Sequence, residues 1–131
     1  MPWSLATALL SLGPSLGPLP AGELDAALSA YRWEARPIVV FAEEGDPRLA
    51  EQLERFRAGA AALRERENVV IVGTGADTPL ARRFEPEGFT VILVGKDGGE
   101  KLREGRVVEV EELNTLIDRM PMRRREMRDG G

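Results

Sequence analysis

Three short runs of β-branched and aromatic residues constrain the fold of this chain more than any other feature. They span residues 37–42, 69–72 and 89–94, and they are apolar at almost every position. Continuous runs of this kind predict strands that are buried on both faces of a sheet. Helical patterns lie between and after the runs, so the sequence predicts an α/β domain.

The helical patterns have recognisable starts and apolar stripes. Asp46-Pro47 is typical of an N-cap followed by proline at the first helical position. The apolar stripe behind it, from Leu49 to Leu63, predicts one long helix. By the same periodicity we expect four helices in all, over residues 24–31, 47–63, 80–85 and 113–120.

The order of the expected elements from residue 37 is β-α-β-α-β-β-α. Its fourth strand is the alternating Lys101-Leu102-Arg103, which follows a turn at residues 96–99. A helical crossover predicts that the first two strands are parallel, and the tight turn predicts that the last two are antiparallel. This is the order of the thioredoxin core. We therefore expect a thioredoxin-like three-layer α/β/α sandwich with a four-stranded mixed sheet and an extra N-terminal helix.

Residues 1–22 differ from the rest of the chain because they carry no charged side chain. The apolar stretch from Trp3 to Leu12 is too short to span a bilayer as a helix. With Ala21 before a plausible cleavage point, it is typical of a secretory signal, although no Lys or Arg precedes it. We expect a signal peptide or a disordered leader at 1–22 and one folded domain at 23–131. The corresponding location is periplasmic or secreted, and the alternative is cytoplasmic.

The chain contains neither cysteine nor histidine. The usual thiolate and imidazole ligands of zinc are therefore missing, and we expect no metal and no cofactor. Ser–His and Cys–His nucleophile pairs are excluded, as is thiol–disulfide oxidoreductase or peroxidase activity through protein cysteines. Whether the chain is an enzyme stays open, and the composition leans against it.

A local comparison with thioredoxins also indicates that the chain lacks redox activity. In thioredoxins the central strand is followed by Ala-Glu-Trp-Cys-Gly-Pro-Cys, whereas here residues 42–48 read Ala-Glu-Glu-Gly-Asp-Pro-Arg. Gly45 and Arg48 thus occupy the positions of the two redox cysteines. Gly88, in front of Phe89, stands where thioredoxins have a cis-proline. The resemblance implies the fold and not the redox activity.

A second resemblance covers nearly all of the chain after residue 23. It is similar to the bacterial family called domain of unknown function 4174, which is thioredoxin-like and related to a domain of animal extracellular proteins with sushi repeats. Four segments carry the resemblance: Tyr31-Arg32-Trp33, the strand ending at Phe41-Ala42, residues 95–103, and residues 117–127 (Ile-Asp-Arg-Met-Pro-Met-Arg-Arg-Arg-Glu-Met). The resemblance implies a fold and commonly an exported protein, and no established activity.

The C-terminal segment 119–131 is the strongest functional lead, because it holds five Arg against Glu126 and Asp129 in a chain of net charge −4. The overall charge gives no reason to expect nucleic acid as a partner. Guanidinium groups bind carboxylates and phosphates in a bidentate manner. The candidate partner-binding residues are Arg123, Arg124, Arg125 and Arg128. In the alternative interpretation they are solvated or pair with acids of the same domain, with Met122 and Met127 helping to anchor the segment.

Three further segments carry candidate functional residues. Tyr31-Arg32-Trp33 is either an aromatic and cationic platform or a pair of packed aromatics with Arg32 in water. The acids Glu43, Glu44 and Asp46 follow the first strand, and residues 73–78 follow the second in a glycine-containing loop. Because the first two strands should be parallel, we expect the loops 43–48 and 73–78 to lie at one sheet edge, where they would support an alternative function, small-ligand binding or catalysis. The favoured function is a protein-binding or structural module without redox cysteines.

Overall fold

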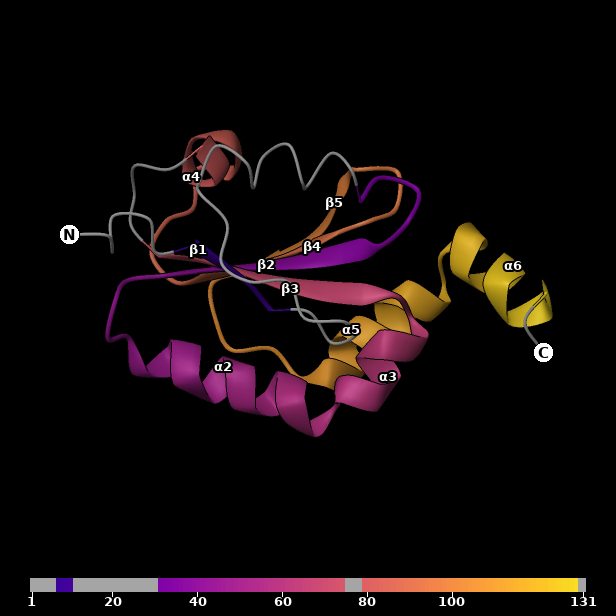
Figure 1. The fold of residues 1–131 in the computed structure, drawn as a ribbon, viewed down its shortest axis with the longest axis horizontal. Helices are drawn as coiled ribbons and strands as arrows, with labels where there is room; N and C mark the ends of the chain where they lie inside the picture. The colour runs from indigo at the N-terminus through magenta and orange to yellow at the C-terminus, as the bar shows by residue number, and fades with distance from the viewer. Residues whose placement is uncertain (1–6, 11–30, 75–78, 130–131) are drawn as a thin grey trace.

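The computed structural model describes residues 7–10, 31–74 and 79–129, and within them it shows a mixed sheet with helices on both faces (Figure 1). The strands are β1 (Thr7–Leu10), β2 (Arg36–Ala42), β3 (Asn68–Thr74), β4 (Thr90–Val94) and β5 (Glu100–Glu104). The helices are α2 (Pro47–Ala58), α3 (Ala60–Glu65), α4 (Pro79–Phe84), α5 (Val110–Asp118) and α6 (Pro121–Asp129). The expected helix at 24–31 lies outside the described residues except for Tyr31.

The sheet confirms the predicted four-stranded arrangement. In the order β1-β3-β2-β4-β5, β2 runs parallel to β3 and antiparallel to β4, and β5 is antiparallel to β4. The register pairs Ile38 with Val70 on one side and with Leu93 on the other. This mixed α/β sheet is consistent with a thioredoxin-like core.

The sheet has one strand more than the sequence predicted. β1 comes from the segment expected to be a leader, and it pairs antiparallel with the outer edge of β3, from Thr7 opposite Gly73 to Leu10 opposite Val70. An edge strand presents unpaired backbone donors and acceptors, and an extended apolar segment can satisfy them. The prediction of a leader at 1–22 stays a prediction.

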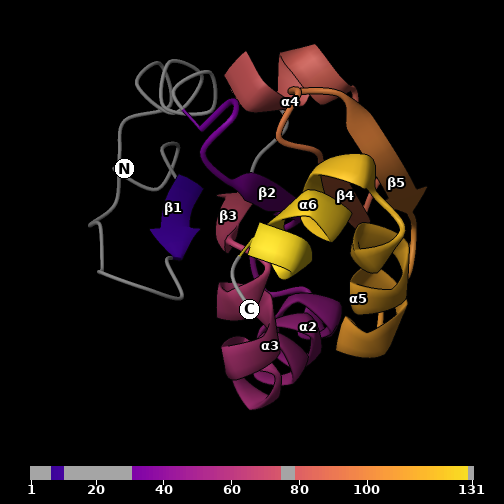
Figure 2. The same cartoon turned by 90° about the vertical axis from the view of Figure 1, so that its right-hand side faces the viewer.

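The core has two layers, because alternate residues of each strand face opposite sides of the sheet. On one side, Ile38, Val40 and Leu93 pack with residues such as Phe56 of α2 and Ile117 of α5. On the other side, Val39, Phe41, Ile71, Ile92 and Val94 pack with Ala81, Phe84 and Tyr31. In Figures 1 and 2, α2, α3 and α5 cover one face of the sheet and α4 lies over the other. The layers of the predicted sandwich are therefore present.

The long helix predicted behind Asp46 is two helices, so that prediction is wrong in detail. The Asp46 side chain accepts a hydrogen bond from the Arg48 N–H at 2.9 Å, and Pro47 begins α2, as expected. The helix is interrupted at Gly59, where a Cβ atom would lie 2.8 Å from Cγ1 of Val110. The junction of α2 and α3 packs directly against the start of α5, and the apolar stripe continues across the break.

The helix predicted over 113–120 ends earlier than expected, and a separate helix follows. α5 stops at Asp118, and α6 starts at Pro121, which is favoured in a first helical turn and cannot continue the preceding one. In Figure 2, α6 lies across the end of the sheet, in front of β2, β3 and β4. None of the helices described combines the length and apolar character that crossing a bilayer requires.

Candidate functional site

Two basic side chains are buried at the sheet end beneath α6. Arg36 is the first residue of β2 and is 1% exposed, and Lys96 follows β4 and is 8% exposed. Burying a cation is costly unless carboxylates and hydrogen bonds compensate for the lost hydration. Their environment therefore has to supply acidic partners.

Glu126 of α6 is the partner that these two cations share. Arg36 donates from Nη1 to Oε1 at 3.1 Å and from Nη2 to Oε2 at 2.9 Å, and Lys96 Nζ donates to Oε2 at 2.7 Å. Burial acts to raise the pKa of Glu126, but hydrogen bonds from Arg36 and Lys96 outweigh it and leave the pKa lowered. Lys96 also donates to Glu67 at 2.7 Å.

A second set of contacts ties the start of α6 to α3 and α5. Arg123, which is 5% exposed, donates from Nε to Asp118 at 3.2 Å and from Nη2 to Glu65 at 2.7 Å. Arg66 donates hydrogen bonds to the Asp118 carboxylate from Nε at 3.0 Å and from Nη2 at 2.9 Å. Hydrogen bonds from Arg66 lower the pKa of Asp118 most, burial opposes them, and Arg123 lowers it further.

We call the eight charged residues joined in this way the ion cluster: Arg36, Glu65, Arg66, Glu67, Lys96, Asp118, Arg123 and Glu126. They come from β2, the end of α3 and the α3–β3 connection, the β4–β5 turn, α5 and α6. A nine-residue helix has little stability alone, because helix nucleation is costly. The ion cluster therefore supplies the contacts that hold α6 on the domain.

The structure divides the four predicted arginines into two groups. Arg123 lies inside the ion cluster, so for this residue pairing within the domain is the correct interpretation. Arg124, Arg125 and Arg128 are exposed, and their side chains make no hydrogen bond or ion pair with the described part of the chain. Met122 is half-buried, whereas Met127 is 41% exposed and does not serve as an anchor.

Trp33 belongs to the same end of the molecule. It is 56% exposed, its backbone φ is 72°, and its N–H donates to the Lys96 carbonyl oxygen at 2.6 Å. A positive φ is unusual for a bulky side chain and is concentrated at functional positions. Of the predicted aromatic pair, Tyr31 packs on the core, and Trp33 projects outward with the Arg32 guanidinium 5.5 Å from its ring centre.

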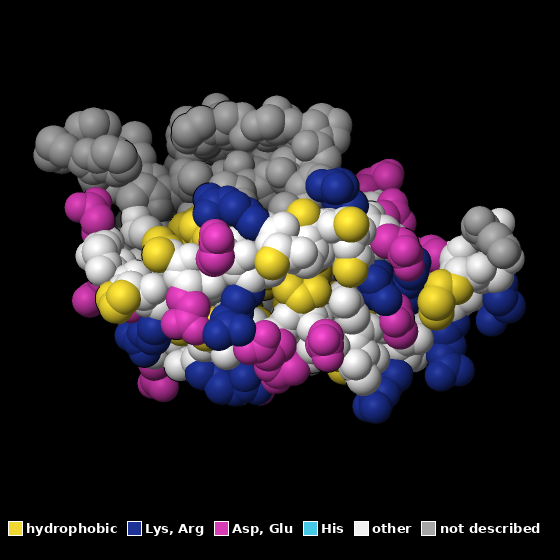
Figure 3. Space-filling view, turned by 90° about the horizontal axis from the view of Figure 1, so that it is seen from below, with side chains coloured by type: hydrophobic (Ala, Val, Ile, Leu, Met, Phe, Trp, Pro, Cys, Tyr) yellow, Lys and Arg dark blue, Asp and Glu magenta, His cyan; other side chains and the backbone are white. Residues whose placement is uncertain are grey.

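Trp33 and Met127 are the large hydrophobic side chains exposed among the described residues. The turn that carries Trp33 and helix α6 lie at the same end of the ribbon in Figure 1. Lys96 links them, since its carbonyl binds Trp33 and its ammonium binds Glu126 next to Met127. We call the set Trp33, Arg124, Arg125, Met127 and Arg128 the α6 face. Dark-blue basic side chains border this end of the molecule in Figure 3.

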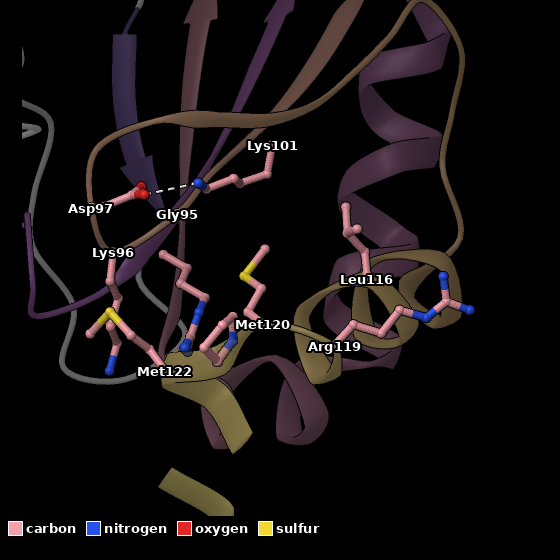
Figure 4. Close-up of a pocket in the computed structure, with 10 residues that line it drawn as sticks. Gly95, Lys96, Asp97, Lys101, Leu116, Arg119, Met120 and Met122 are labelled. Carbon is pink, nitrogen blue, oxygen red and sulfur yellow. Dashed lines mark hydrogen bonds and ion pairs between the residues drawn. The ribbon is translucent and has the colours of Figure 1, made fainter. Parts of the chain in front are cut away.

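A pocket of about 340 Å³ opens between the β4–β5 turn and the α5–α6 junction. Its lining residues are Arg36, Gly95, Lys96, Asp97, Lys101, Leu116, Arg119, Met120, Pro121 and Met122. Figure 4 shows Lys101 and Asp97 on one side of the pocket, Leu116 and Arg119 on the other, and Met120 between them. No pattern in the sequence indicated this pocket.

Of the two loops predicted to form the alternative site, the structure describes residues 43–48 in full. Gly45 and Arg48, at the positions of the lost cysteines, are both exposed. The Arg48 guanidinium donates two hydrogen bonds to the Asp46 carboxylate and lies 5.1 Å from the Phe89 ring centre. No acidic cluster that could hold a metal occurs in the described part of the chain. Residues 75–78 of the partner loop lie outside the described residues.

Sequence reasoning missed Arg36, Lys96 and Glu126 as functional positions, although a signal was present. Arg36 directly precedes the apolar run 37–42, and Lys96 follows the apolar run 89–94 after Gly95. A charged residue at such a position needs a counter-ion from elsewhere in the chain. The segment 117–127 offered Asp118 and Glu126 for this role, spaced among its arginines.

Comparison with known proteins gives one family and no activity. The family model described as domain of unknown function (DUF4174) matches residues 78–126. The match confirms the resemblance for that part of the chain, which includes Lys96, Asp118, Arg123 and Glu126. No curated protein and no solved structure gives a significant match.

Proposed function

We propose that this chain, whose residues 78–126 match the domain of unknown function 4174 family, is a protein-binding module. The proposed contact surface is the α6 face, and the proposed partner is a protein segment with acidic residues around an apolar side chain. The observation that carries the proposal is the division of α6 into a clamped inner side and an unpaired outer side. Arg123 and Glu126 are used inside the domain, while Arg124, Arg125 and Arg128 are not.

The composition of the α6 face supports a protein partner. Trp, Met and Arg are enriched in protein interfaces, and Trp and Arg are frequent among the residues that contribute most binding energy. Arginine also suits carboxylate recognition, because its planar fork presents two parallel donors. The buried ion cluster holds the helix in place, which lowers the cost of ordering it during binding.

The proposal is tested by photo-crosslinking in the native host. A photoreactive amino acid is placed at Arg125 or at Trp33, and at Arg57 on α2 as a control distant in the fold. We expect both α6-face positions to crosslink to the same protein and the Arg57 position to miss it. Equal crosslinking from all three positions, or none from the α6 face, would contradict the proposal.

A charge variant provides the second arm. Arg124→Ser, Arg125→Ser and Arg128→Ser together should abolish the crosslink made from Trp33 and leave the thermal midpoint nearly unchanged, because the three side chains have no described partner. The matched control, Arg48→Ser, Arg57→Ser and Arg106→Ser, removes the same charge from other surfaces and should retain the crosslink. Unfolding of the α6 triple variant would instead show that these arginines are structural.

Export remains part of the proposal on the strength of the uncharged, apolar segment at residues 1–22. Intact mass and cell fraction of the native protein test it. Loss of about twenty N-terminal residues with recovery outside the cytoplasm would support export, in line with typical signal lengths. A full-length cytoplasmic protein would contradict it.

A further inference from the structure

The pocket between the β4–β5 turn and the α5–α6 junction has a wall of hydrogen-bond donors. Its lining includes four cationic side chains, Arg36, Lys96, Lys101 and Arg119, and a single acidic one, Asp97. An ammonium group has three N–H donors and a guanidinium five. The balance between the donors present and the acceptors that occupy them decides what the pocket can bind.

Several of these donors are unused within the described residues. Lys96 Nζ meets two carboxylates, Glu67 and Glu126, and Lys101 Nζ meets one, Asp97, at 2.9 Å. The Nε atom of the buried Arg36 has no hydrogen-bond partner. Arg119 is exposed, and no described residue pairs with its guanidinium. Arg36 Nε is closed off from the surface, whereas Lys101 and Arg119 are exposed, so their free donors can meet an acceptor from outside the chain.

The charge balance favours a ligand with one negative charge. Within the ion cluster four cations (Arg36, Arg66, Lys96, Arg123) face four carboxylates (Glu65, Glu67, Asp118, Glu126), and Lys101 faces Asp97. Five cations against five anions leave Arg119, a surplus of one positive charge at the outer rim of the pocket, since in Figure 4 its guanidinium points away from Lys96 and Lys101. A carboxylate matches this surplus, whereas a phosphate dianion would exceed it.

The remaining lining is apolar. Leu116, Met120, Pro121 and Met122 line the pocket on the α5–α6 side. Methionine side chains are flexible and adapt to irregular apolar shapes. The volume of about 340 Å³ lies at the lower end of the range for small-molecule sites, so the space suits a short chain better than a fused ring system.

We propose that this pocket binds a small aliphatic carboxylate. The carboxylate accepts hydrogen bonds from the unused donors of Lys101 and Lys96, and the hydrocarbon chain lies along Leu116, Met120 and Met122. The Lys101 side chain crosses over Gly95: a Cβ atom there would lie 2.5 Å from Lys101 Cε and would displace the end of this flexible side chain. The proposal does not depend on the α6 face, since it uses a different set of side chains.

The experiment uses the full chain and octanoate as the probe, read by thermal shift and by calorimetric titration. Three compounds serve as matched comparators. Octanol lacks the charge of octanoate, octylammonium carries the opposite charge, and acetate lacks the hydrocarbon chain. We expect octanoate alone to raise the thermal midpoint, and to do so in a concentration-dependent manner. Equal stabilisation by octanol, or no response to octanoate at any concentration, would overturn the proposal.

Three variants locate the binding. Lys101→Ala breaks only an exposed ion pair with Asp97, so the domain should stay folded while octanoate binds about tenfold more weakly. Met122→Glu places a like charge beside the carboxylate and should abolish binding. Arg57→Ala, on α2, should bind as the unmodified protein does. Unchanged affinity in both pocket variants would place the probe elsewhere and overturn the assignment.

The two proposals fail separately. The Arg124, Arg125 and Arg128 triple variant should lose partner crosslinking and keep octanoate binding. Lys101→Ala should show the reverse. Loss of both activities in either variant would contradict the separation of the pocket from the α6 face.

Discussion

Arg36 and Glu126 are 90 positions apart in the chain, and their side chains meet in a two-bond ion pair at 2.9 and 3.1 Å. The guanidinium is 1% exposed and the carboxylate 23% exposed, so the pair closes the sheet end beneath α6. Glu126 lies in the most basic segment of the chain, where it neutralises cations of the core. The segment is thus a structural clamp on its inner side and a cationic surface on its outer side.

Neutralising Glu126 should destabilise the domain. Glu126→Gln leaves Arg36 and Lys96 buried without their shared carboxylate, and breaking a buried pair by removing one partner costs about 3–5 kcal/mol. Because Glu126 is partly exposed, we expect less than that range, about 2–3 kcal/mol, in urea unfolding. The control Glu54→Gln touches only the exposed pair with Arg57 at 3.8 Å and should change stability by less than about 0.5 kcal/mol. A Glu126→Gln variant as stable as this control would contradict the clamp.

Acid should loosen the domain through the same residues. The pKa values of Asp118 and Glu126 are lowered in the folded state. Their stabilisation is complete above the unfolded values, about 3.9 for Asp and about 4.3 for Glu, and is lost as the pH falls through the folded values. Glu112, whose pKa Arg106 lowers to about 2, is exposed and adds little. Urea midpoints measured from neutral to acid pH should fall less steeply in Glu126→Gln, and identical slopes would contradict the assignment.

The fold could be predicted from the sequence because its buried strands are marked by short apolar runs that can be recognised locally. Residues 37–42 and 89–94 are apolar runs with clear ends, and the connections between strands determine which pairs are parallel. The close approach of Gly59 to Val110 could not be predicted, because the two residues are 51 positions apart in the chain (110 − 59) and meet only after folding. Local periodicity carries no information about such a close approach.

Gly59 offers a test of that packing. Gly59→Ala places a methyl group 2.8 Å from Val110, and overpacking of this kind costs about 1–3 kcal/mol. Adding Val110→Ala should recover most of the loss by making room for the methyl group. Urea midpoints of the single and double variants measure the coupling. Losses that simply add would show that the two residues do not meet.

Gln52 is a buried polar side chain with a reciprocal partner. Its Nε2 donates to the Val108 carbonyl oxygen at 3.0 Å, and its Oε1 accepts from the Val108 N–H at 2.8 Å. Gln52→Leu keeps the volume and leaves both backbone groups unsatisfied, at about 1–3 kcal/mol each. Gln52→Glu retains an acceptor for the N–H. Calorimetric unfolding should rank the original chain above both variants, and a Gln52→Leu variant of unchanged stability would show that these hydrogen bonds contribute nothing.

The candidate site could be predicted only in part. The arginines of residues 123–128 stood out by charge, but composition alone could not divide them, because the counter-ions come from distant elements. Arg123 faces Glu65 across 58 positions, while Arg124 and Arg125 face solvent. The pocket escaped prediction for the same reason, since Lys96 and Met122 become neighbours only through the clamp.

Backbone hydrogen exchange of α6, measured by mass spectrometry, tests the clamp most directly. In the unmodified protein the amides of residues 124–129 should exchange slowly, close to the rate of α5, and Glu126→Gln should release them while the sheet amides stay protected. Exchange of α6 at the rate of an unfolded chain in the unmodified protein would contradict the central claim that buried ion pairs hold this helix on the domain.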